Sequence, residues 1–344
     1  MQVGVNYPWF DYGWDFGLGP PSWRGARNTP GWYAEIDDHL RLFQSLGISV
    51  VRWFILADGL TYGVEEAAPV PDPVARGGWR FDPPPLSGEC LEHFDELLAR
   101  FEAARANGRP AIQLIPVLID FHFCRSGTRP VEKLNPFDPG TPTEDPAWVK
   151  RGRADALTDA TKRRRFLDHV LDPFLRASHR YPEVIYAWEL INEPEWVTRG
   201  WHTSRFARTP VPQAAMRAFI EEGAARIRAA GFKPTIGFAS IGTLWQSGIT
   251  AEINQFHHYP GGARALDRHD FDPSLPGIIG EFATAGTDVW PELTVSDQSV
   301  LHRLRLARSH GYPLAIPWSF RARDRHTIWS AGVERDIETF THEV

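Results

Sequence analysis

The chain has 344 residues, of which 42% are hydrophobic and 23% are charged, and its formal net charge at pH 7 is −6. These proportions are ordinary for a folded globular protein, and without a basic excess we expect no nucleic-acid partner. No run of about 18 apolar residues occurs, so we expect no membrane span and no membrane partner. One α/β barrel of about 250 residues with loop insertions accommodates this length, so we expect a single domain over residues 1–344.

Short β-rich segments alternate with longer amphipathic segments, which is the pattern of parallel strand–helix units. The eight predicted strands are Val3–Tyr7, Val50–Leu56, Ile112–Ile119, Val184–Ile191, Thr235–Ala239, Ile253–His257, Gly277–Glu281 and Leu314–Trp318. Apolar residues at three- and four-residue spacing predict helices at Ile36–Leu46, Cys90–Ala106, Ala160–His179, Ala214–Ala230 and Ser296–His310. Helix C-caps are expected at Gly47, Gly108, Gly231 and Gly311. Eight such units predict the α/β class and a (β/α)8 TIM barrel.

The longest irregular segments, 57–85, 120–159 and 194–212, each follow a predicted strand. In a barrel these long loops lie on the C-terminal face, where barrel enzymes hold their sites. We therefore expect them to form the walls of a cleft. The proline-rich stretch Pro69–Pro85 could instead be a linker between two domains, but the alternation of helix, strand and loop continues across it.

The two cysteines, Cys90 and Cys124, could form at most one disulfide and lack a metal-ligand spacing such as Cys-x-x-Cys. We interpret both as ordinary thiols. The chain opens on a predicted strand, with no basic or apolar segment of a signal peptide before it. The expected location is the cytoplasm, or outside the cell after removal of a signal peptide.

Tryptophan is frequent, with 14 residues in the chain. Six of them lie in the first quarter: Trp9, Trp14, Trp23, Trp32, Trp53 and Trp79. The flat apolar face of an indole packs well in a core and equally well against a sugar ring. The cluster therefore supports a sugar site only in combination with catalytic residues.

Two glutamates end strands that are predicted to lie across the barrel from one another. Glu193 follows the fourth strand in the segment Trp-Glu-Leu-Ile-Asn-Glu-Pro, and Glu281 ends the seventh strand. Taken singly, each is most simply a charged strand end that caps a helix or pairs with a surface base. Together they match what glycoside hydrolysis needs, where one carboxyl group protonates the leaving oxygen while the other attacks or activates water.

The segment Trp188–Pro194 resembles the signature of the clan A retaining glycosidases, most closely glycoside hydrolase family 5. The resemblance extends from the first strand to the eighth. It implies that Glu193 is the general acid/base, that Glu281 is the nucleophile, and that the Asn192 amide binds the sugar 2-hydroxyl group. The implied protein is a retaining β-glycoside hydrolase that acts on an oligosaccharide or polysaccharide and needs no metal and no cofactor.

Other strands carry further matches to this family. Arg52 matches the second-strand arginine that keeps the nucleophile ionised, and Trp318 matches the eighth-strand tryptophan beneath the sugar. The segment Asp-Phe-His at 120–122 resembles the third-strand Asp-x-His element, which places His122 at the glycone site. The order of these motifs along the chain is more specific than any one of them.

The sixth strand ends in His257-His258-Tyr259, whose His-x-Tyr spacing implies site roles for His257 and Tyr259 but not for His258. From the residues alone, the histidine pair with His122 and the carboxylates could also hold zinc. Adjacent strand residues point to opposite faces, so only one of the pair can face the site. A metal-dependent hydrolase on this barrel is therefore one alternative, and a barrel that binds sugars without cleaving them is another.

Charge arguments support the roles of the two glutamates. Beside Arg52 and Tyr259, the pKa of Glu281 is expected to fall, which keeps a nucleophile ionised. An anionic Glu281 in a partly desolvated cleft is expected to raise the pKa of Glu193, as a general acid requires. In a retaining enzyme their carboxyl carbons should lie roughly 5–5.5 Å apart.

Two more acids flank the fourth-strand motif. We interpret Glu189 as a partner for a barrel arginine and Glu195 as a loop acid. The sequence favours a β-mannan or β-glucan substrate. It leaves open the identity of the sugar, endo or exo action, and hydrolysis or transglycosylation.

Overall fold

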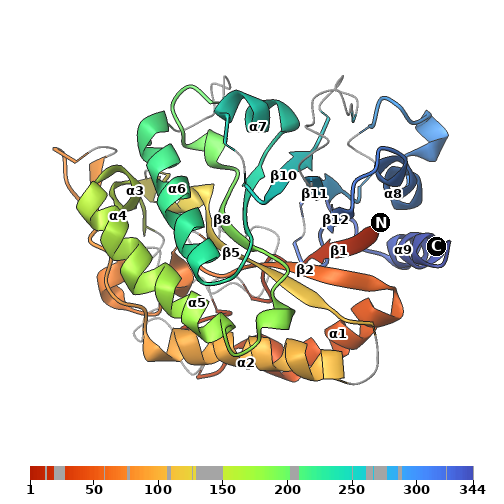
Figure 1. Ribbon diagram of the computed structural model, residues 1–344, viewed down its shortest axis with the longest axis horizontal. Helices are drawn as coiled ribbons and strands as arrows, with labels where there is room; N and C mark the ends of the chain where they lie inside the picture. The colour runs from red at the N-terminus through yellow and green to blue at the C-terminus, as the bar shows by residue number, and fades with distance from the viewer. Residues whose placement is uncertain are drawn as a thin grey trace.

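In the computed structural model, eight parallel strands close into a barrel in the order β1-β12-β11-β10-β9-β8-β5-β2 (Figure 1). The predicted α/β class and (β/α)8 barrel are confirmed, and all eight predicted strands are present. The fourth was predicted to begin four residues too early, since Pro182–Val184 form a 3-10 helix, whereas the ends of the other strands shift by at most two residues. The bounds of the eight strands are β1 (Gln2–Asn6), β2 (Ile48–Phe54), β5 (Gln113–Asp120), β8 (Trp188–Asn192), β9 (Pro234–Phe238), β10 (Ile253–His258), β11 (Gly277–Ala283) and β12 (Leu314–Trp318). The structure describes residues 1–11, 14–18, 28–57, 59–75, 78–106, 110–125, 127–128, 150–201, 209–249, 251–260, 266, 277–285, 289–322 and 324–343.

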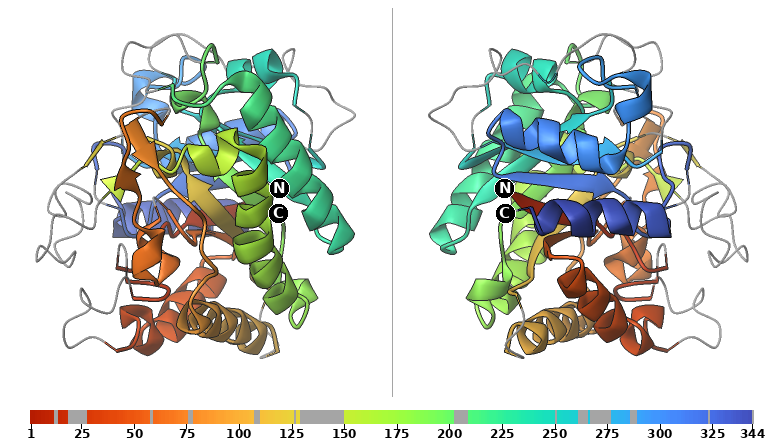
Figure 2. Two further views of the ribbon diagram at one scale, coloured as in Figure 1. Left: turned by 90° about the vertical axis from the view of Figure 1, so that its left-hand side faces the viewer. Right: turned by 90° about the vertical axis from the view of Figure 1, so that its right-hand side faces the viewer.

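Helices surround the barrel on its outside (Figures 1 and 2). Their bounds are α1 (Ile36–Ser45), α2 (Gly88–Ala106), α3 (Asp155–Thr158), α4 (Ala160–Phe166), α5 (Asp172–Ser178), α6 (Gln213–Ala229), α7 (Ile241–Ser247), α8 (Val300–Ser309) and α9 (Ala331–Thr341). Among the described residues, no helix is both long and apolar enough to cross a membrane.

Two of the helix predictions need correction, and three helices were missed. The helix predicted over 160–179 is interrupted by a π-helical turn at Leu167–Leu171 between α4 and α5. The last predicted helix begins later, because the Ser299 side chain accepts the His302 N–H and so caps α8. Helices α3, α7 and α9 were not predicted.

The predicted helix ends at three glycines agree with the structure. Gly47, Gly231 and Gly311 have positive φ angles of 73°, 78° and 77°, the left-handed conformation that glycine adopts readily. Gly108 lies outside the described residues.

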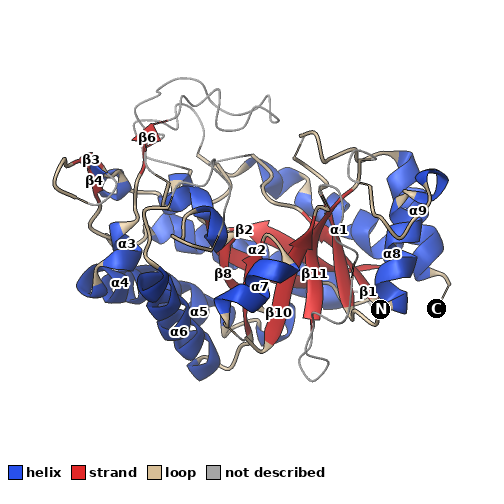
Figure 3. Ribbon diagram, turned by 90° about the horizontal axis from the view of Figure 1, so that it is seen from above, coloured by secondary structure: helices blue, strands red, loops and turns tan. Residues whose placement is uncertain are grey.

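Two short antiparallel hairpins extend the loops that follow β2 and β5. One pairs β3 (Val70–Pro71) with β4 (Trp79–Arg80), and the other pairs β6 (Gly127–Thr128) with β7 (Lys150–Arg151) (Figure 3). The buried Arg153 joins these loops, since its Nε donates to the Ala67 carbonyl at 2.9 Å and its guanidinium lies 5.4 Å from the ring centres of Phe81 and Phe123. The loops are therefore packed together.

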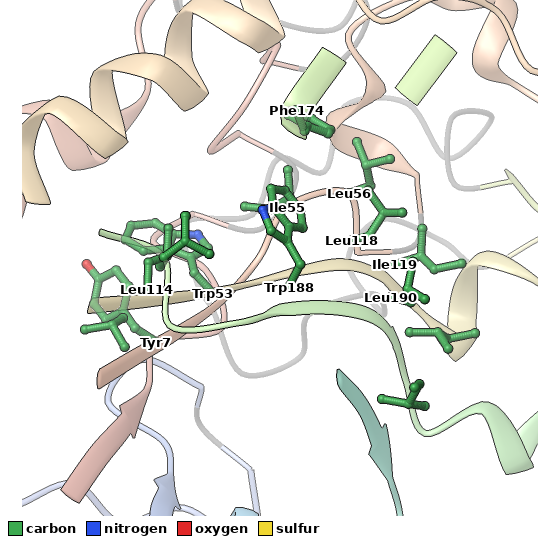
Figure 4. Close-up of a cluster of buried hydrophobic side chains, with 14 of the residues drawn as sticks. Tyr7, Trp53, Ile55, Leu56, Leu114, Leu118, Ile119, Phe174, Trp188 and Leu190 are labelled. Atoms are coloured by element: carbon green, nitrogen blue, oxygen red, sulfur yellow. The ribbon is translucent and has the colours of Figure 1, made fainter. Parts of the chain in front are cut away.

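Alternation along each strand separates an outer core from the barrel interior. On β2, Trp53 packs outward in the large core cluster between strands and helices, which includes Trp188 and Phe174 (Figure 4). Its neighbour Arg52 points inward and is fully buried. Below it, apolar side chains fill the interior: Val50, Ile115, Ala187, Ile253, Ile278, Leu314 and Ile316.

Candidate active site

The C-terminal ends of the strands bring seven of the predicted site residues into one hydrogen-bonded network. The network connects Arg52, His122, Asn192, Glu193, His257, Tyr259 and Glu281, either directly or through Asp120. The eighth, Trp318, lies at the end of β12 beside Ala283, two residues after Glu281 on β11. These residues come from positions far apart in the chain, and barrel closure is what gathers them.

Arg52 is the centre of the network. Its Nη1 donates to Glu281 Oε1 at 2.6 Å and to Asn6 Oδ1 at 2.9 Å, while Nη2 donates to Asn192 Oδ1 at 2.7 Å. Glu189 pairs with it in bidentate fashion at 2.6 and 2.7 Å, as we predicted for a barrel arginine. Such two-pronged bonds fix orientation as well as charge. Asn6 was not predicted as a site residue, although a polar residue at the end of an otherwise apolar first strand could have indicated one.

Glycines make room for this buried polar layer. A side chain at Gly237 would collide with the carboxyl group of Glu189, and one at Gly280 would lie 2.6 Å from Gln255 Nε2. Gln255 in turn donates to Glu189 at 2.7 Å. Glu189 thus has partners for both oxygens, as a buried carboxylate requires.

Glu281 receives the two contacts that were predicted for it. Arg52 lies at 2.6 Å, and the Tyr259 hydroxyl donates to Oε2 at 2.9 Å. The predicted net fall of its pKa is nevertheless wrong. Burial raises the pKa of Glu281 above its usual value, and it outweighs the opposing effects of His257, Arg52 and Tyr259.

Glu193 has a different environment. Its Oε1 lies 2.9 Å from His257 Nδ1, and its Oε2 accepts the Trp196 indole N–H at 2.9 Å. Burial raises the pKa of Glu193 to about 7, with a further increase from the charge of Asp120. The direction is as predicted, but burial is the main cause. Trp196 was not predicted, because nothing in the local pattern shows where its ring points.

The backbone of Glu193 is in the left-handed region, with φ 46° and ψ 53°. For a residue other than glycine this conformation costs about 1–3 kcal/mol and is held by the surroundings. The Glu193 N–H donates to the Gly237 carbonyl at 2.6 Å, and Pro194 fixes the chain that follows. The strained turn directs the carboxyl group toward the centre of the barrel mouth.

The histidine pair divides between two faces, as predicted. His257 Nδ1 lies 2.9 Å from Glu193 and 3.5 Å from Glu281, whereas His258 packs edge-on against Trp290 with ring centres 4.5 Å apart. Burial lowers the pKa of each histidine to about 4, so both are neutral at pH 7.

Asp120 links His122 to the centre of the site. Its Oδ1 accepts the Asn192 amide N–H at 2.8 Å, and its Oδ2 contacts His122 Nδ1 and accepts the His122 backbone N–H at 3.1 Å. Burial raises the pKa of Asp120, but His122 and the hydrogen bonds outweigh it, so the net pKa is lowered. Asp120 orients two predicted sugar-binding residues, a role that we did not assign to it.

An aromatic surface lies beside this network. Trp318 is half-buried, donates from Nε1 to Asp324 Oδ2 at 2.9 Å, and meets Trp9 and Phe54 edge-on at 6.4 and 6.3 Å. Of the other early tryptophans, Trp14, Trp32 and Trp53 are buried core residues, Trp79 is half-buried, and Trp23 lies outside the described residues.

Replacing Trp318 with alanine should raise KM for an oligosaccharide by about tenfold, because one stacked face contributes about 1–1.5 kcal/mol. The melting temperature should change little, since the ring is half-exposed at the end of its strand. Trp245→Ala on α7, where the ring is 43% exposed, is the matched control and should leave KM unchanged. An unchanged KM in the Trp318 variant would show that its ring does not bind sugar.

Glu195 corrects the prediction of a loop acid. It lies in a short 3-10 helix, η10 (Pro194–Trp196), and is 0% exposed. Its Oε1 accepts the backbone N–H of Ala239 at 2.8 Å. Burial raises the pKa of Glu195 to about 8, with a further increase from Glu193.

Both cysteines are buried free thiols, as expected. Three of the site residues, Glu193, His257 and Glu281, offer ligand atoms within 4.8 Å of one another, a geometry that a metal ion could use. With His257 neutral, an Nδ1–H between the two carboxylates accounts for the same cluster as hydrogen bonding.

No protein-family model and no curated protein sequence matches this chain. Solved structures do match it. The β-mannanase from the blue mussel Mytilus edulis has a TM-score of 0.64 and 17% identity, covering 99% of this chain and 91% of its own. The β-1,4-D-mannanase from Cryptopygus antarcticus has a TM-score of 0.67 and 17% identity, covering 99% and 90%. A glycoside hydrolase family 5 enzyme from Prevotella bryantii has a TM-score of 0.54 and 14% identity, covering 98% and 95%. This chain therefore has the barrel fold of these glycoside hydrolases.

Proposed function

We propose that the protein is a retaining β-glycoside hydrolase with Glu193 as general acid/base and Glu281 as nucleophile. The observation that carries the proposal is that the two carboxyl groups face one another, with an oxygen of each within 4.8 Å of the other and with His257 Nδ1 between them at 2.9 and 3.5 Å, a close approach that favours the retaining arrangement. Retaining glycosidases hold their carboxyl groups about 5–5.5 Å apart, whereas inverting enzymes need about 6.5–9.5 Å to admit a water molecule.

In the first step, Glu281 attacks the anomeric carbon, the bond to the leaving oxygen breaks, and Glu193 gives that oxygen its proton. The pKa of about 7 at Glu193 supports a protonated acid near neutral pH. Arg52 and Tyr259 remain bonded to Glu281 and stabilise its ionised form. In the second step, Glu193 takes a proton from water, whose oxygen displaces Glu281, and the anomeric configuration is retained.

The substrate that we propose is a β-linked glycan of the mannan or glucan type. Trp318 offers a half-exposed ring for the face of a sugar. The Asn192 amide donates one N–H to Asp120 and keeps a second for a sugar hydroxyl. Mannan is favoured because two of the compared structures are β-mannanases.

The decisive test is the configuration of the first product, followed by NMR during hydrolysis of mannan, glucan and xylan oligomers and aryl β-glycosides. A β-configured product on at least one of these substrates is expected, because two displacements at one carbon restore its configuration. An α-configured first product would rule out the retaining mechanism, and no cleavage of any substrate would favour the sugar-binding barrel.

A metal-dependent hydrolase is the second candidate, because of the cluster formed by Glu193, His257 and Glu281. We expect activity to survive EDTA, because in the proposed retaining mechanism Glu193 transfers the proton and Glu281 is the nucleophile, so no Lewis acid is needed. The measurement is kcat/KM after dialysis against EDTA, with and without added zinc. Loss of activity on chelation and its return with zinc would support the metal mechanism instead.

A further inference from the structure

Glu195 is buried two residues after Glu193 and has no part in the mechanism above. We propose that Glu195 is a positioning residue, which fastens the chain after Glu193 to the end of β9 and so holds the acid/base carboxyl group at the leaving oxygen. This inference rests on the proposed function of Glu193.

The environment of Glu195 indicates a specific bond rather than space filling. Its Oε1 accepts the Ala239 N–H at 2.8 Å, where the chain leaves β9. The Glu195 backbone N–H and the Thr243 side chain on α7 also stabilise the ionised carboxyl group, while Oε2 is buried and makes no hydrogen bond of ordinary geometry within the described part of the chain. Burying a carboxyl group is unfavourable, so an apolar side chain would fill this space at lower cost. The carboxyl group adds the bond to Ala239, which an apolar side chain could not form.

Glu193 needs support on both sides because its backbone is left-handed. On the near side, its own N–H donates to the Gly237 carbonyl at 2.6 Å. After Glu193, the Glu195 side chain accepts the N–H of Ala239, which is two residues after Gly237 in the chain. The acid/base residue is thus held between two points at the end of the same strand, and removal of Glu195 releases one of them.

The protonation state of Glu195 allows a close mimic. Burial raises its pKa to about 8, so the group is neutral at pH 7. Glutamine has nearly the same shape and keeps an oxygen that can accept from Ala239. Alanine lacks this oxygen, and aspartate is one methylene too short to reach from the same backbone position.

The experiment compares Glu195→Gln, Glu195→Asp and Glu195→Ala on two aryl β-glycosides, one with a poor leaving group and one with dinitrophenolate. The matched control is Thr198→Val, since the buried Thr198 hydroxyl donates to the Pro194 carbonyl at 2.8 Å, a hydrogen bond within the segment that follows Glu193. Melting temperatures are measured for all variants.

For the poor leaving group, the alanine and aspartate variants should lose on the order of 10²-fold in kcat, because a small misplacement of the acid slows proton transfer. With dinitrophenolate, which needs little protonation, the first step should lose less than about tenfold. The glutamine variant should stay within about threefold of wild type. Thr198→Val should melt earlier but keep the wild-type dependence on the leaving group.

Any of three results would overturn the inference. The alanine and aspartate variants could lose the same factor in rate on both substrates, or they could be as fast as wild type. The third such result is a glutamine variant that is as slow as the alanine variant. If Glu195→Ala does not fold, the comparison of Glu195→Asp with Glu195→Gln on the same two substrates tests the inference in the same way. A different result would contradict the proposed function of Glu193, namely that Glu193→Ala itself shows no dependence on the leaving group.

Discussion

Replacing Glu281 with alanine should slow hydrolysis of every β-glycoside by a factor on the order of 10⁵, because it removes the attacking atom itself. A better leaving group should not help, since no glycosyl-enzyme intermediate can form. The fold should survive, because Arg52 keeps its bidentate pairing with Glu189. The measurement is kcat/KM across aryl β-glycosides of graded leaving-group quality.

Azide provides a second readout for this variant. It can enter only from the face that Glu281 vacated, so a β-glycoside should give the α-glycosyl azide. The control is Glu338→Ala, which removes an exposed glutamate on α9 and should behave as wild type. A β-azide, or recovery of hydrolysis with dinitrophenolate as leaving group, would exclude Glu281 as the nucleophile.

Replacing Glu193 with alanine should slow poor leaving groups by a factor on the order of 10²–10⁴. The first step with a dinitrophenyl glycoside should be nearly spared, because that leaving group needs little protonation. Azide needs no base to attack, so it should rescue the second step and give the β-glycosyl azide. The measurements are burst kinetics and the configuration of the azide product.

The pH profile gives an independent check on Glu193. Its pKa is raised to about 7, and its protonated form is the general acid in the proposed mechanism, so wild-type kcat/KM should fall as pH rises through about 7. This fall should be absent from the dinitrophenyl reaction of the alanine variant. If Glu193→Ala and Glu281→Ala show the same dependence on the leaving group and give the same azide product, the roles that we assign to Glu193 and Glu281 are wrong.

The barrel could be predicted because its strands are buried on both faces and stand out as apolar runs, as in β5, where residues 114–119 are all apolar and buried. Two of the missed helices are short, since α3 has four residues and α7 has seven. Helix α9 was missed although its buried residues Val333, Ile337 and Phe340 recur at helical spacing. The π-helical turn at Leu167–Leu171 barely disturbs the spacing of apolar residues, so periodicity does not reveal it.

The positions of the candidate site residues were predictable, because strand ends place Glu193 and Glu281 at the barrel mouth. The contacts of Glu281 with Arg52 and Tyr259 followed from the family resemblance, whereas the partners Asn6, Asp120 and Trp196 were missed because they depend on where side chains point in the closed barrel. The pKa of Glu281 depends on the depth of its burial, which an arrangement of charges along a sequence does not contain. From the sequence, Glu195 is a charged residue in the loop after the fourth strand, where exposure to solvent is the usual expectation. It is buried because the chain turns at Glu193 into a short 3-10 helix, which the sequence does not reveal.

The single guanidinium of Arg52 joins four strands, since it belongs to β2 and holds side chains from β1, β8 and β11, namely Asn6, Glu189, Asn192 and Glu281. The bonds that orient Glu281, the proposed nucleophile, are therefore the same bonds that tie different strands of the barrel together. The reaction centre then belongs to the global cooperative unit and has no low-energy opening of its own. On heating, catalytic competence and the barrel should vanish in one transition, so a change that stabilises the scaffold also widens the temperature range over which the enzyme works.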